Sequence, residues 1–262
     1  MDRSDDYIEL GLPGFIAARH YREVSSTMDV ARDWIERYSS PELASALIVA
    51  DYQTQGRGRQ GRQWLSGEGA FMATFAFEVE LPRAALSGYS LAVGVGIARA
   101  FRDRNIEVAL KWPNDLVAIV EGSLRKLGGI LVEVHDVRSR TYLLVGLGVN
   151  VNPAPSDVGH IAVSLLELGS DSPRSSDLIR PIASRMVGVH TQFAQGAGVS
   201  PFLSEWRTLS AFRRSQTRLT IDLGAETISG VYVDIDSSGA LLLSVDGTTR
   251  TVHSGHILEV KY

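Results

Sequence analysis

The stretch LIVADYQTQGRGRQGRQWLSGEGAFMATFAFEVE, residues 47–80, predicts two β-strands joined by a basic, glycine-rich loop. The apolar run over residues 47–52 is typical of a buried strand. Residues 70–80 alternate with the two-residue period of a strand. Between these runs, residues 53–64 interleave glycine with arginine. We therefore expect a functional loop held between two strands.

The loop has the composition of an anion-binding site. Its glycines permit backbone conformations closed to other residues and let main-chain N–H groups face an anion, while arginine binds phosphate oxygens in a bidentate manner. A solvated basic loop and an RNA-contacting segment are the alternatives. The position between two strands in an acidic chain favours a loop that binds a polyphosphate. The residues concerned are Gly56, Gly58, Gly61, Arg57, Arg59 and Arg62.

The composition of the whole chain narrows the classes of protein. The chain has 262 residues, of which 44% are hydrophobic and 21% charged, and its formal net charge is −4. These values exclude a fully disordered chain and a general cationic field for nucleic acid or anionic lipid. With no cysteine, the chain has no disulfide, cysteine-based metal site or cysteine nucleophile. The N-terminus lacks the apolar core of a signal peptide and no apolar run approaches ~18 residues, so we expect a cytoplasmic protein without a membrane span.

The order of predicted elements indicates an α+β protein rather than a regular alternation of strands and helices. The expected helices cover residues 25–38, 87–104, 177–195 and 200–210, with Pro181 interrupting the third. Further strands are expected over residues 106–111, 115–120, 128–135 and 141–151. The Pro-, Ser- and Gly-rich residues 153–176 predict a mobile loop with a short helix.

The last part of the chain predicts a small all-β module. Short strands alternate with tight turns, and SSG at 237–239 and DG at 246–247 are hairpin signals. We therefore expect two domains, residues 1–213 and residues 214–262.

The stretch LKWPNDLV, residues 110–117, predicts a turn because Pro113 bars a continuous central strand. The turn displays Lys111, which can meet a phosphate, Asn114, which can bind a base edge, and Asp115, which can hold Mg²⁺. An ordinary polar β-turn is the alternative.

Two further motifs place small residues in or beside strands. They are RKLGGILVEV at 125–134 and VGLGVNVNP at 145–153, where a ligand or another backbone can approach closely. Lys126 precedes a pair of glycines, and a hairpin turn with a solvated lysine is the alternative. Asn150 is a polar side chain in an apolar run, so its partner is either a ligand base or a neighbouring backbone.

Other familiar signatures are absent from the sequence. It contains no GxxxxGK[ST], GxSxG or HExxH, and its six histidines show no metal spacing on a helix. Large apolar side chains at regular spacing are expected in the core rather than against a ligand; they are Met28, Trp34, Phe71, Phe75 and Phe77.

The four motifs, in this order, resemble those of the biotin protein ligases, and the resemblance covers about residues 20–262. It implies a catalytic domain similar to class II aminoacyl-tRNA synthetases, with a mixed sheet, followed by an SH3-like β-barrel domain. Some members of the family carry an N-terminal winged-helix domain and act as repressors. This chain begins only about 20 residues before the catalytic region, so direct DNA binding is not expected.

The resemblance also implies roles for individual residues. For biotin it implies contacts from Ser26, Thr27, Gln53, Gly56, Arg57, Gly58, Arg59, Trp64, Lys126, Gly128 and Gly129. For the nucleotide it implies contacts from Arg57, Arg59, Arg62, Lys111, Trp112, Asn114, Asp115, Asn150, Ala162 and Ser164. The implied catalytic residues are Arg59, Lys111, Asp115 and Lys126, with Asp115 as a ligand of Mg²⁺. Two positions depart from the family pattern: Met28 replaces an asparagine and Val163 replaces a threonine.

The activity that the resemblance implies is ATP-dependent attachment of biotin to a lysine. The acceptor would be the biotin-carrier domain of an acetyl-CoA or acyl-CoA carboxylase, the intermediate biotinyl-5′-AMP, and the cofactor Mg²⁺. A lipoate–protein ligase is the nearest enzymatic alternative, and the short arginine-rich loop with KWPND favours biotin over it. A non-catalytic biotin or adenylate sensor and an RNA-binding protein are alternatives of a different class.

Overall fold

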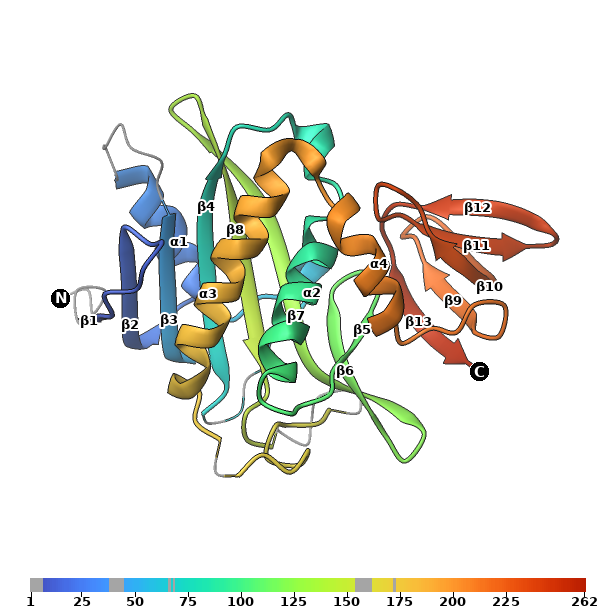
Figure 1. The fold of residues 1–262 in the computed structure, drawn as a ribbon, viewed down its shortest axis with the longest axis horizontal. Helices are drawn as coiled ribbons and strands as arrows, with labels where there is room; N and C mark the ends of the chain where they lie inside the picture. Colours follow the sequence, from blue (N-terminus) through green and yellow to red (C-terminus); the bar gives the residue numbers. More distant parts are fainter. Residues whose placement is uncertain (1–6, 38–44, 66, 68, 154–161, 172) are drawn as a thin grey trace.

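A mixed eight-stranded sheet forms the centre of the protein (Figure 1). The computed structural model describes residues 7–37, 45–65, 67, 69–153, 162–171 and 173–262. The strand order is β1-β2-β3-β4-β8-β7-β6-β5; β2 and β3 are parallel, and the other neighbouring strands are antiparallel. The strands are β1 Tyr7–Glu9, β2 Ala17–Val24, β3 Ser45–Gln53, β4 Phe71–Val79, β5 Ala109–Lys111, β6 Asp115–Val120, β7 Ser123–Val137 and β8 Arg140–Val149.

Helices cover both faces of this sheet, which explains why its central strands are apolar at successive positions. The helices are α1 Thr27–Arg37, α2 Tyr89–Arg102, α3 Ser176–Gln192 and α4 Ser200–Leu209. Along β3, Leu47 and Val49 share a core with α2, α3 and α4, whereas Ala46, Ile48 and Ala50 pack with α1 on the opposite face. The expected α+β class and the strands of residues 47–80 are confirmed.

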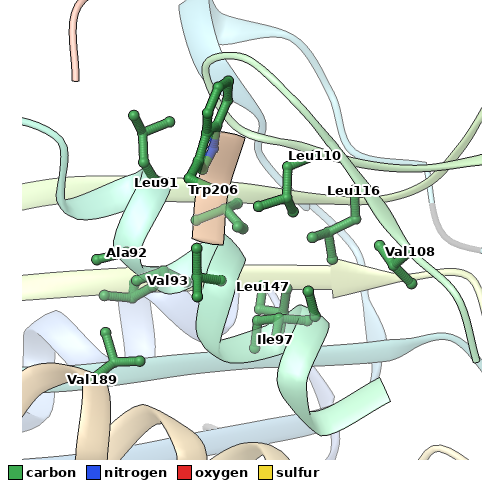
Figure 2. Packing of buried hydrophobic residues seen from close by; sticks show 14 of the residues in the cluster. Leu91, Ala92, Val93, Ile97, Val108, Leu110, Leu116, Leu147, Val189 and Trp206 are labelled. Atoms are coloured by element: carbon green, nitrogen blue, oxygen red, sulfur yellow. The ribbon is translucent and has the colours of Figure 1, made fainter. Parts of the chain in front are cut away.

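The larger core is built around α2. Figure 2 shows Leu91, Val93 and Ile97 of this helix beside Leu110 of the sheet and Trp206 of α4. Trp206 is among the largest fully buried side chains of the described residues. The segment Arg83–Arg102 is long and apolar enough to cross a membrane by length and composition, but 67% of its most apolar window is buried inside the protein. The expectation that no such stretch exists was therefore wrong, and its apolar character is explained by its place in the core.

The C-terminal strands form a separate antiparallel sheet in the order β12-β11-β10-β9-β13 (Figure 1). They are β9 Arg218–Asp222, β10 Thr227–Ile235, β11 Leu241–Val245, β12 Thr248–Val252 and β13 His256–Lys261. The turn signals are confirmed, since Asp246 and Gly247 both adopt positive φ between β11 and β12. This sheet contacts the larger one through Trp112, whose indole N–H donates to the carbonyl of Gly239 at 3.0 Å.

Two expectations differ from the structure. Helix α3 continues through Pro181 rather than being interrupted by it. A proline there removes one main-chain hydrogen bond and costs about 3 kcal/mol, which is offset because Leu178, Ile182 and Met186 of the same helix are buried in the core. The short helix expected within residues 153–176 is not found in their described part, where Leu165–Gly169 form a turn; residues 154–161 and 172 lie outside the described residues.

His190 of α3 is a partly buried titratable group at the junction of helix and sheet. Its Nε2 lies 3.1 Å from the carbonyl oxygen of Glu78, its Nδ1 lies 3.2 Å from the Tyr89 hydroxyl, and its ring stacks on Phe77 with the centroids 4.5 Å apart. Burial lowers the pKa of His190 from 6.5 to about 4, because it penalises the charged ring; the hydrogen bond with Glu78 acts in the opposite direction.

We predict that His190 makes the fold sensitive to acid. The unfolded chain binds this proton from near pH 6.5 downwards, whereas the folded chain resists it to about pH 4, so the free energy of unfolding falls as the pH decreases across this window. The variant His190→Gln should lose less stability than the wild type between about pH 7.5 and about pH 5 in urea denaturation. Equal losses in the two proteins would contradict this assignment.

Candidate active site

One cavity of about 440 Å³ brings together residues that are distant in sequence. Its walls come from the start of α1, the glycine-arginine loop, the turn between β5 and β6, the inner strands β7 and β8, and the start of β13. The sequence-predicted residues that line it are Ser26, Thr27, Gln53, Arg57, Gly58, Arg59, Arg62, Trp64, Lys111, Trp112, Asn114, Asp115, Lys126 and Gly129. Below, residues 56–64 are called the arginine loop.

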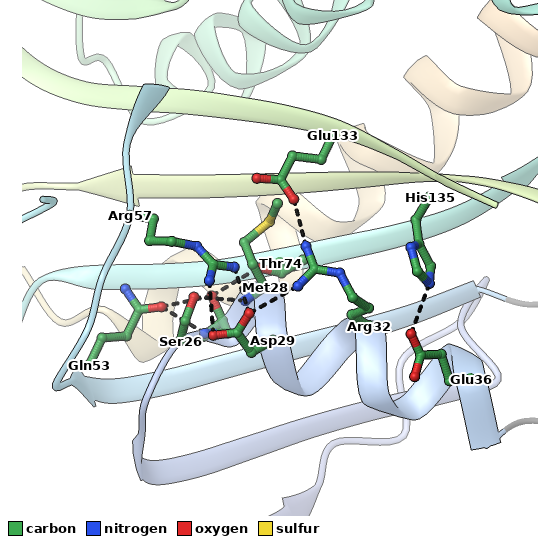
Figure 3. A network of polar contacts seen from close by, with 11 residues as sticks. Ser26, Met28, Asp29, Arg32, Glu36, Gln53, Arg57, Thr74, Glu133 and His135 are labelled. Atoms are coloured by element: carbon green, nitrogen blue, oxygen red, sulfur yellow. Dashed lines mark hydrogen bonds and ion pairs between the residues drawn. The ribbon is translucent and has the colours of Figure 1, made fainter. Parts of the chain in front are cut away.

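The N-terminus of α1 forms a polar wall of the cavity. The Oε1 atom of Gln53 accepts hydrogen bonds from the Thr27 main-chain N–H at 2.7 Å and from the Thr27 hydroxyl at 3.0 Å, and the Thr74 hydroxyl donates to Thr27 at 2.8 Å (Figure 3). Ser26 caps the helix by accepting from the N–H of Met28 at 3.3 Å. Since the Gln53 oxygen is occupied, its amide N–H groups are the donors it can offer to a ligand.

Met28 is both a core residue and a cavity residue. Only 3% of it is exposed, and it packs with the smaller core around α1. Its sulfur also lies 3.1 Å from the position that a Cβ atom on Gly146 would occupy, and the side chain lines the cavity beside Leu131. The expectation that Met28 belongs to the core is confirmed, and Met28 also lines the cavity; whether it contacts a ligand stays a prediction.

Trp64 lies against a floor of glycines, which is why small residues recur in β7 and β8. A Cβ atom on Gly148 would meet the Trp64 indole at 2.5 Å, and one on Gly129 would meet it at 3.4 Å. Gly56 fixes the other side of the tryptophan, because its carbonyl accepts from the Trp64 N–H at 2.9 Å and a Cβ there would lie 2.8 Å from the Trp64 carbonyl. The structure shows a close approach at Gly129 and Gly148, but the side chain of Trp64 makes it, rather than the ligand or backbone that was expected. The Trp64 indole N–H is buried without a hydrogen-bond partner.

The cations of the cavity fall into two groups. Arg57 is neutralised by Asp29 of α1, to which its two Nη atoms donate at 2.6 and 3.1 Å (Figure 3). Lys126 is neutralised by Asp115, with 2.7 Å between Nζ and the carboxylate. Both partners of this second pair are largely buried, with side-chain exposures of 23% and 19%.

The second group of cations has no ion-pair partner to neutralise it in the part of the chain that the structure describes. Among the described residues, no carboxylate lies within 4 Å of Arg59, Arg62 or Lys111. Arg59 donates instead to the side-chain oxygen of Asn114 at 3.2 Å and to the carbonyl of Gly255 at 3.4 Å. Three cations that have no ion-pair partner among the described residues favour a bound anion.

Burial strengthens this preference for an anion. The pKa of Lys111 is lowered, first by burial of the ammonium group, with Asp115 acting in the opposite direction and Lys126 lowering it further. The pKa of Arg59 is likewise lowered by burial, although arginine stays protonated at any physiological pH. A phosphate placed beside these groups would remove much of the cost of their desolvation.

Five predicted residues do not line the cavity, namely Gly56, Gly128, Asn150, Ala162 and Ser164. Gly128 is needed for strand packing, because a Cβ there would lie 2.6 Å from the Gly148 carbonyl. Asn150 is buried and donates to the carbonyls of Lys126 and Val163 at 3.3 and 3.2 Å, which is the main-chain alternative considered for it. Asn150 and Ala162 contact the main chain at Lys126. The contacts of the five residues with biotin or a nucleotide stay a prediction.

The C-terminal module supplies a wall that the sequence did not indicate. Gly255, His256, Ile257 and Leu258 line the cavity, and His256 accepts a hydrogen bond from Arg62, with 2.8 Å between Nη1 and Nε2. No motif in the segment HSGHILEV connects it with the arginine loop, and their separation of 194 residues hides the contact from any local pattern.

Comparison with known proteins gives the class to which this geometry belongs. Residues 21–150 match the Biotin/lipoate A/B protein ligase family, and residues 216–258 match the Biotin protein ligase C terminal domain. The chain is 31% identical over 250 residues to the biotin–[acetyl-CoA-carboxylase] ligase of Mycobacterium tuberculosis, covering 91% of this chain and 88% of that protein. It is 33% identical over 223 residues to the bifunctional ligase/repressor BirA of Escherichia coli, covering 82% and 67%.

A solved structure agrees with these matches. The biotin protein ligase from Aquifex aeolicus in complex with biotin and ATP superimposes with a TM-score of 0.75 and 26% sequence identity, covering 94% of this chain and 99% of that one. The chain belongs to the biotin protein ligase family. The resemblance carried by the four motifs is thereby confirmed, as is the expectation of a mixed-sheet catalytic domain followed by a small β domain.

We predict that the glycine floor holds the arginine loop through Trp64. In Gly148→Ala the new methyl group would overlap the indole, so the loop should be displaced and the amides of residues 56–64 should exchange with deuterium about tenfold faster, the equivalent of about 1.4 kcal/mol. Gly188→Ala is the matched control, because a Cβ on Gly188 meets nothing within 4 Å. Unchanged exchange in Gly148→Ala would show that Trp64 does not hold the loop.

Proposed function

We propose that this protein attaches biotin to a lysine of a carrier domain, using ATP and passing through biotinyl-5′-AMP. The observation that carries the proposal is the set of three cations without carboxylate partners, Arg59, Arg62 and Lys111, at a cavity that also has an apolar part. Met28 and Leu131 belong to that part, together with Ala73, Ile130 and Leu147. A carboxylic acid with an apolar body and a triphosphate would complement these two regions.

The family relatives support the choice of ligands. The A. aeolicus protein is described with biotin and ATP bound, and the M. tuberculosis protein is named for acetyl-CoA carboxylase as its target. We infer that the carrier domain of such a carboxylase is the acceptor here. The biotin ring system would lie toward Met28, within reach of the Gln53 amide, and the triphosphate toward Arg62 and Lys111.

The first step needs electrostatic help rather than a base. A carboxylate is already ionised at neutral pH, so its oxygen can attack the α-phosphorus of ATP directly. A P–O bond forms to give the mixed anhydride, and the bond to the β-phosphate oxygen breaks to release pyrophosphate. Arg59, Arg62 and Lys111 offset the repulsion between the two anions and stabilise the leaving pyrophosphate. Trp64 and the arginine loop line the cavity, and closed over the substrates they would keep water away from the labile adenylate.

The second step consumes the adenylate. The neutral amine of the acceptor lysine attacks the carbonyl carbon, an amide bond forms, and AMP leaves with the electrons of the anhydride bond. Asp115 is the sole carboxylate among the described residues that line the cavity, so it is the group that would orient the amine and take its proton. Lys126, paired with Asp115 at 2.7 Å, would then be free to hold the departing phosphate.

The residues present are compatible with Mg²⁺, although they do not form a complete site for it. No group of three or more metal-ligating side chains occurs among the described residues, but Mg²⁺ commonly binds through one or two carboxylates, phosphate oxygens and water. In the first step Asp115 would be the protein ligand, and the ion would neutralise phosphate charge when bound; the role of Asp115 toward the acceptor amine belongs to the second step, after pyrophosphate has left.

Biotin-dependent exchange of labelled pyrophosphate into ATP tests the function, with lipoate and octanoate as parallel acids. We expect exchange with biotin alone, because adenylation is reversible and the cavity is formed for that acid. Exchange with lipoate instead of biotin would indicate a lipoate–protein ligase, which is the alternative activity within the same family. Binding of biotin without exchange would make it a sensor and would overturn the roles given to Lys111 and Asp115.

A second prediction separates the two ligands of the cavity. Arg59→Ala should weaken retention of biotinyl-5′-AMP by about tenfold or more, since hydrogen bonds to charged groups contribute about 1.5–3 kcal/mol, while biotin affinity changes little. Calorimetry with each ligand measures both, and Arg180→Ala on an exposed position of α3 is the control. Equal losses for biotin and adenylate would contradict the assignment of Arg59 to the phosphate.

A further inference from the structure

The arginine loop is attached to the C-terminal module by two hydrogen bonds. Arg62 donates to the ring of His256, with Nη1 2.8 Å from Nε2 and 3.2 Å from Nδ1, and Arg59 donates to the carbonyl of Gly255 at 3.4 Å. Gly255 is itself fixed, because a Cβ there would lie 2.7 Å from the side chain of Ile221. The acceptor carbonyl of Gly255 therefore belongs to a well-packed part of the module.

Both acceptors are uncharged, which sets them apart from the acceptors of the neighbouring cations. Arg57 and Lys126 are each held by a carboxylate, Asp29 and Asp115 respectively, and each pair is close to neutral. An imidazole fixes the direction of the Arg62 guanidinium without cancelling its charge. A carboxylate at the same position would hold Arg62 equally well but would compete with a phosphate for it.

Burial and the nearby charges favour the neutral form of His256, which can accept a hydrogen bond. Burial lowers the pKa of His256, and the nearby charges of Arg62, Lys111 and Lys126 lower it further, while Asp115 acts in the opposite direction. A neutral histidine has one ring nitrogen free to accept, whereas a protonated one has none. The cations that surround His256 thus favour the form that can hold Arg62.

We propose that His256 is a positioning residue for adenylation: it holds Arg62 at the cavity as an uncharged acceptor, so that the C-terminal module closes the arginine loop over the substrates while leaving the guanidinium charge for a phosphate. The inference rests on the proposed function, because it takes the anion at Arg62 to be a nucleotide phosphate. It gives the C-terminal module a direct part in retaining the intermediate.

Three substitutions of His256 distinguish two effects: ordering of the arginine loop, and preservation of the positive charge on Arg62. His256→Ala removes the acceptor, His256→Gln supplies an uncharged one, and His256→Glu supplies a charged one. His253→Ala is the matched control, since His253 is exposed on the same segment. Deuterium exchange of residues 56–64 in the protein without ligands measures loop order, calorimetry measures ATP affinity, and release of preformed biotinyl-5′-AMP measures retention; the melting temperature reports folding.

The expected pattern differs for each variant. His256→Ala should release the adenylate about tenfold faster and expose the loop amides to exchange, as expected for a lost hydrogen bond to a charged group. His256→Gln should restore most of the retention. His256→Glu should keep the loop ordered but bind ATP about tenfold more weakly, which a merely structural role would not produce. His253→Ala should resemble the wild type in every measurement.

Two results would overturn the proposal. One is retention of the adenylate by His256→Ala at the wild-type level, and the other is equal ATP affinity in His256→Glu and His256→Gln. A failure of the proposed function would look different, because the wild type would show no pyrophosphate exchange with any acid. In that case, slower deuterium exchange of the loop in the wild type than in His256→Ala would still show that His256 holds the loop. A wild type that does not bind ATP would show that this contact does not serve a nucleotide phosphate.

Discussion

Arg59 and Arg62 are held at the cavity by acceptors that carry no charge, and the chemistry proposed for this fold depends on that arrangement. A guanidinium held by a carboxylate is close to neutral and has little attraction left for a phosphate. The protein uses such pairs for Arg57 and Lys126, which border the same cavity. Neutral amide, carbonyl and imidazole groups position the remaining arginines, so the loop is ordered while positive charge stays available where the anion would lie.

The parts of the fold that supply these acceptors are far apart in the chain. Asn114 lies in the turn between β5 and β6. In the C-terminal module, Gly255 directly precedes β13 and His256 is the first residue of that strand. Trp112 joins the same two regions, because its indole N–H bonds to Gly239 of the module. The module is therefore a wall of the cavity, and its packing against the large sheet determines how the arginine loop is held.

Sequence patterns predicted the parts of this structure whose causes are local. The strand over residues 70–80 and the Asp246–Gly247 turn each follow from conformational rules that act over a few residues. The small residues of β7 and β8 predicted a close approach there, but not that Trp64 makes it. The pairing of Arg57 with Asp29 and of Arg62 with His256 joins residues with no shared pattern, so only the folded chain reveals it. Pro181 was misjudged for the related reason that burial of its helix in the core outweighs a local helix-breaking preference.

A crystal structure of the protein with biotin and an ATP analogue tests the central claim most directly. The account predicts phosphate oxygens within hydrogen-bonding distance of Arg59, Arg62 and Lys111, with Arg62 still donating to His256 and Arg57 still paired with Asp29. A triphosphate bound away from those three cations, with Arg59 and Arg62 turned toward solvent, would contradict it.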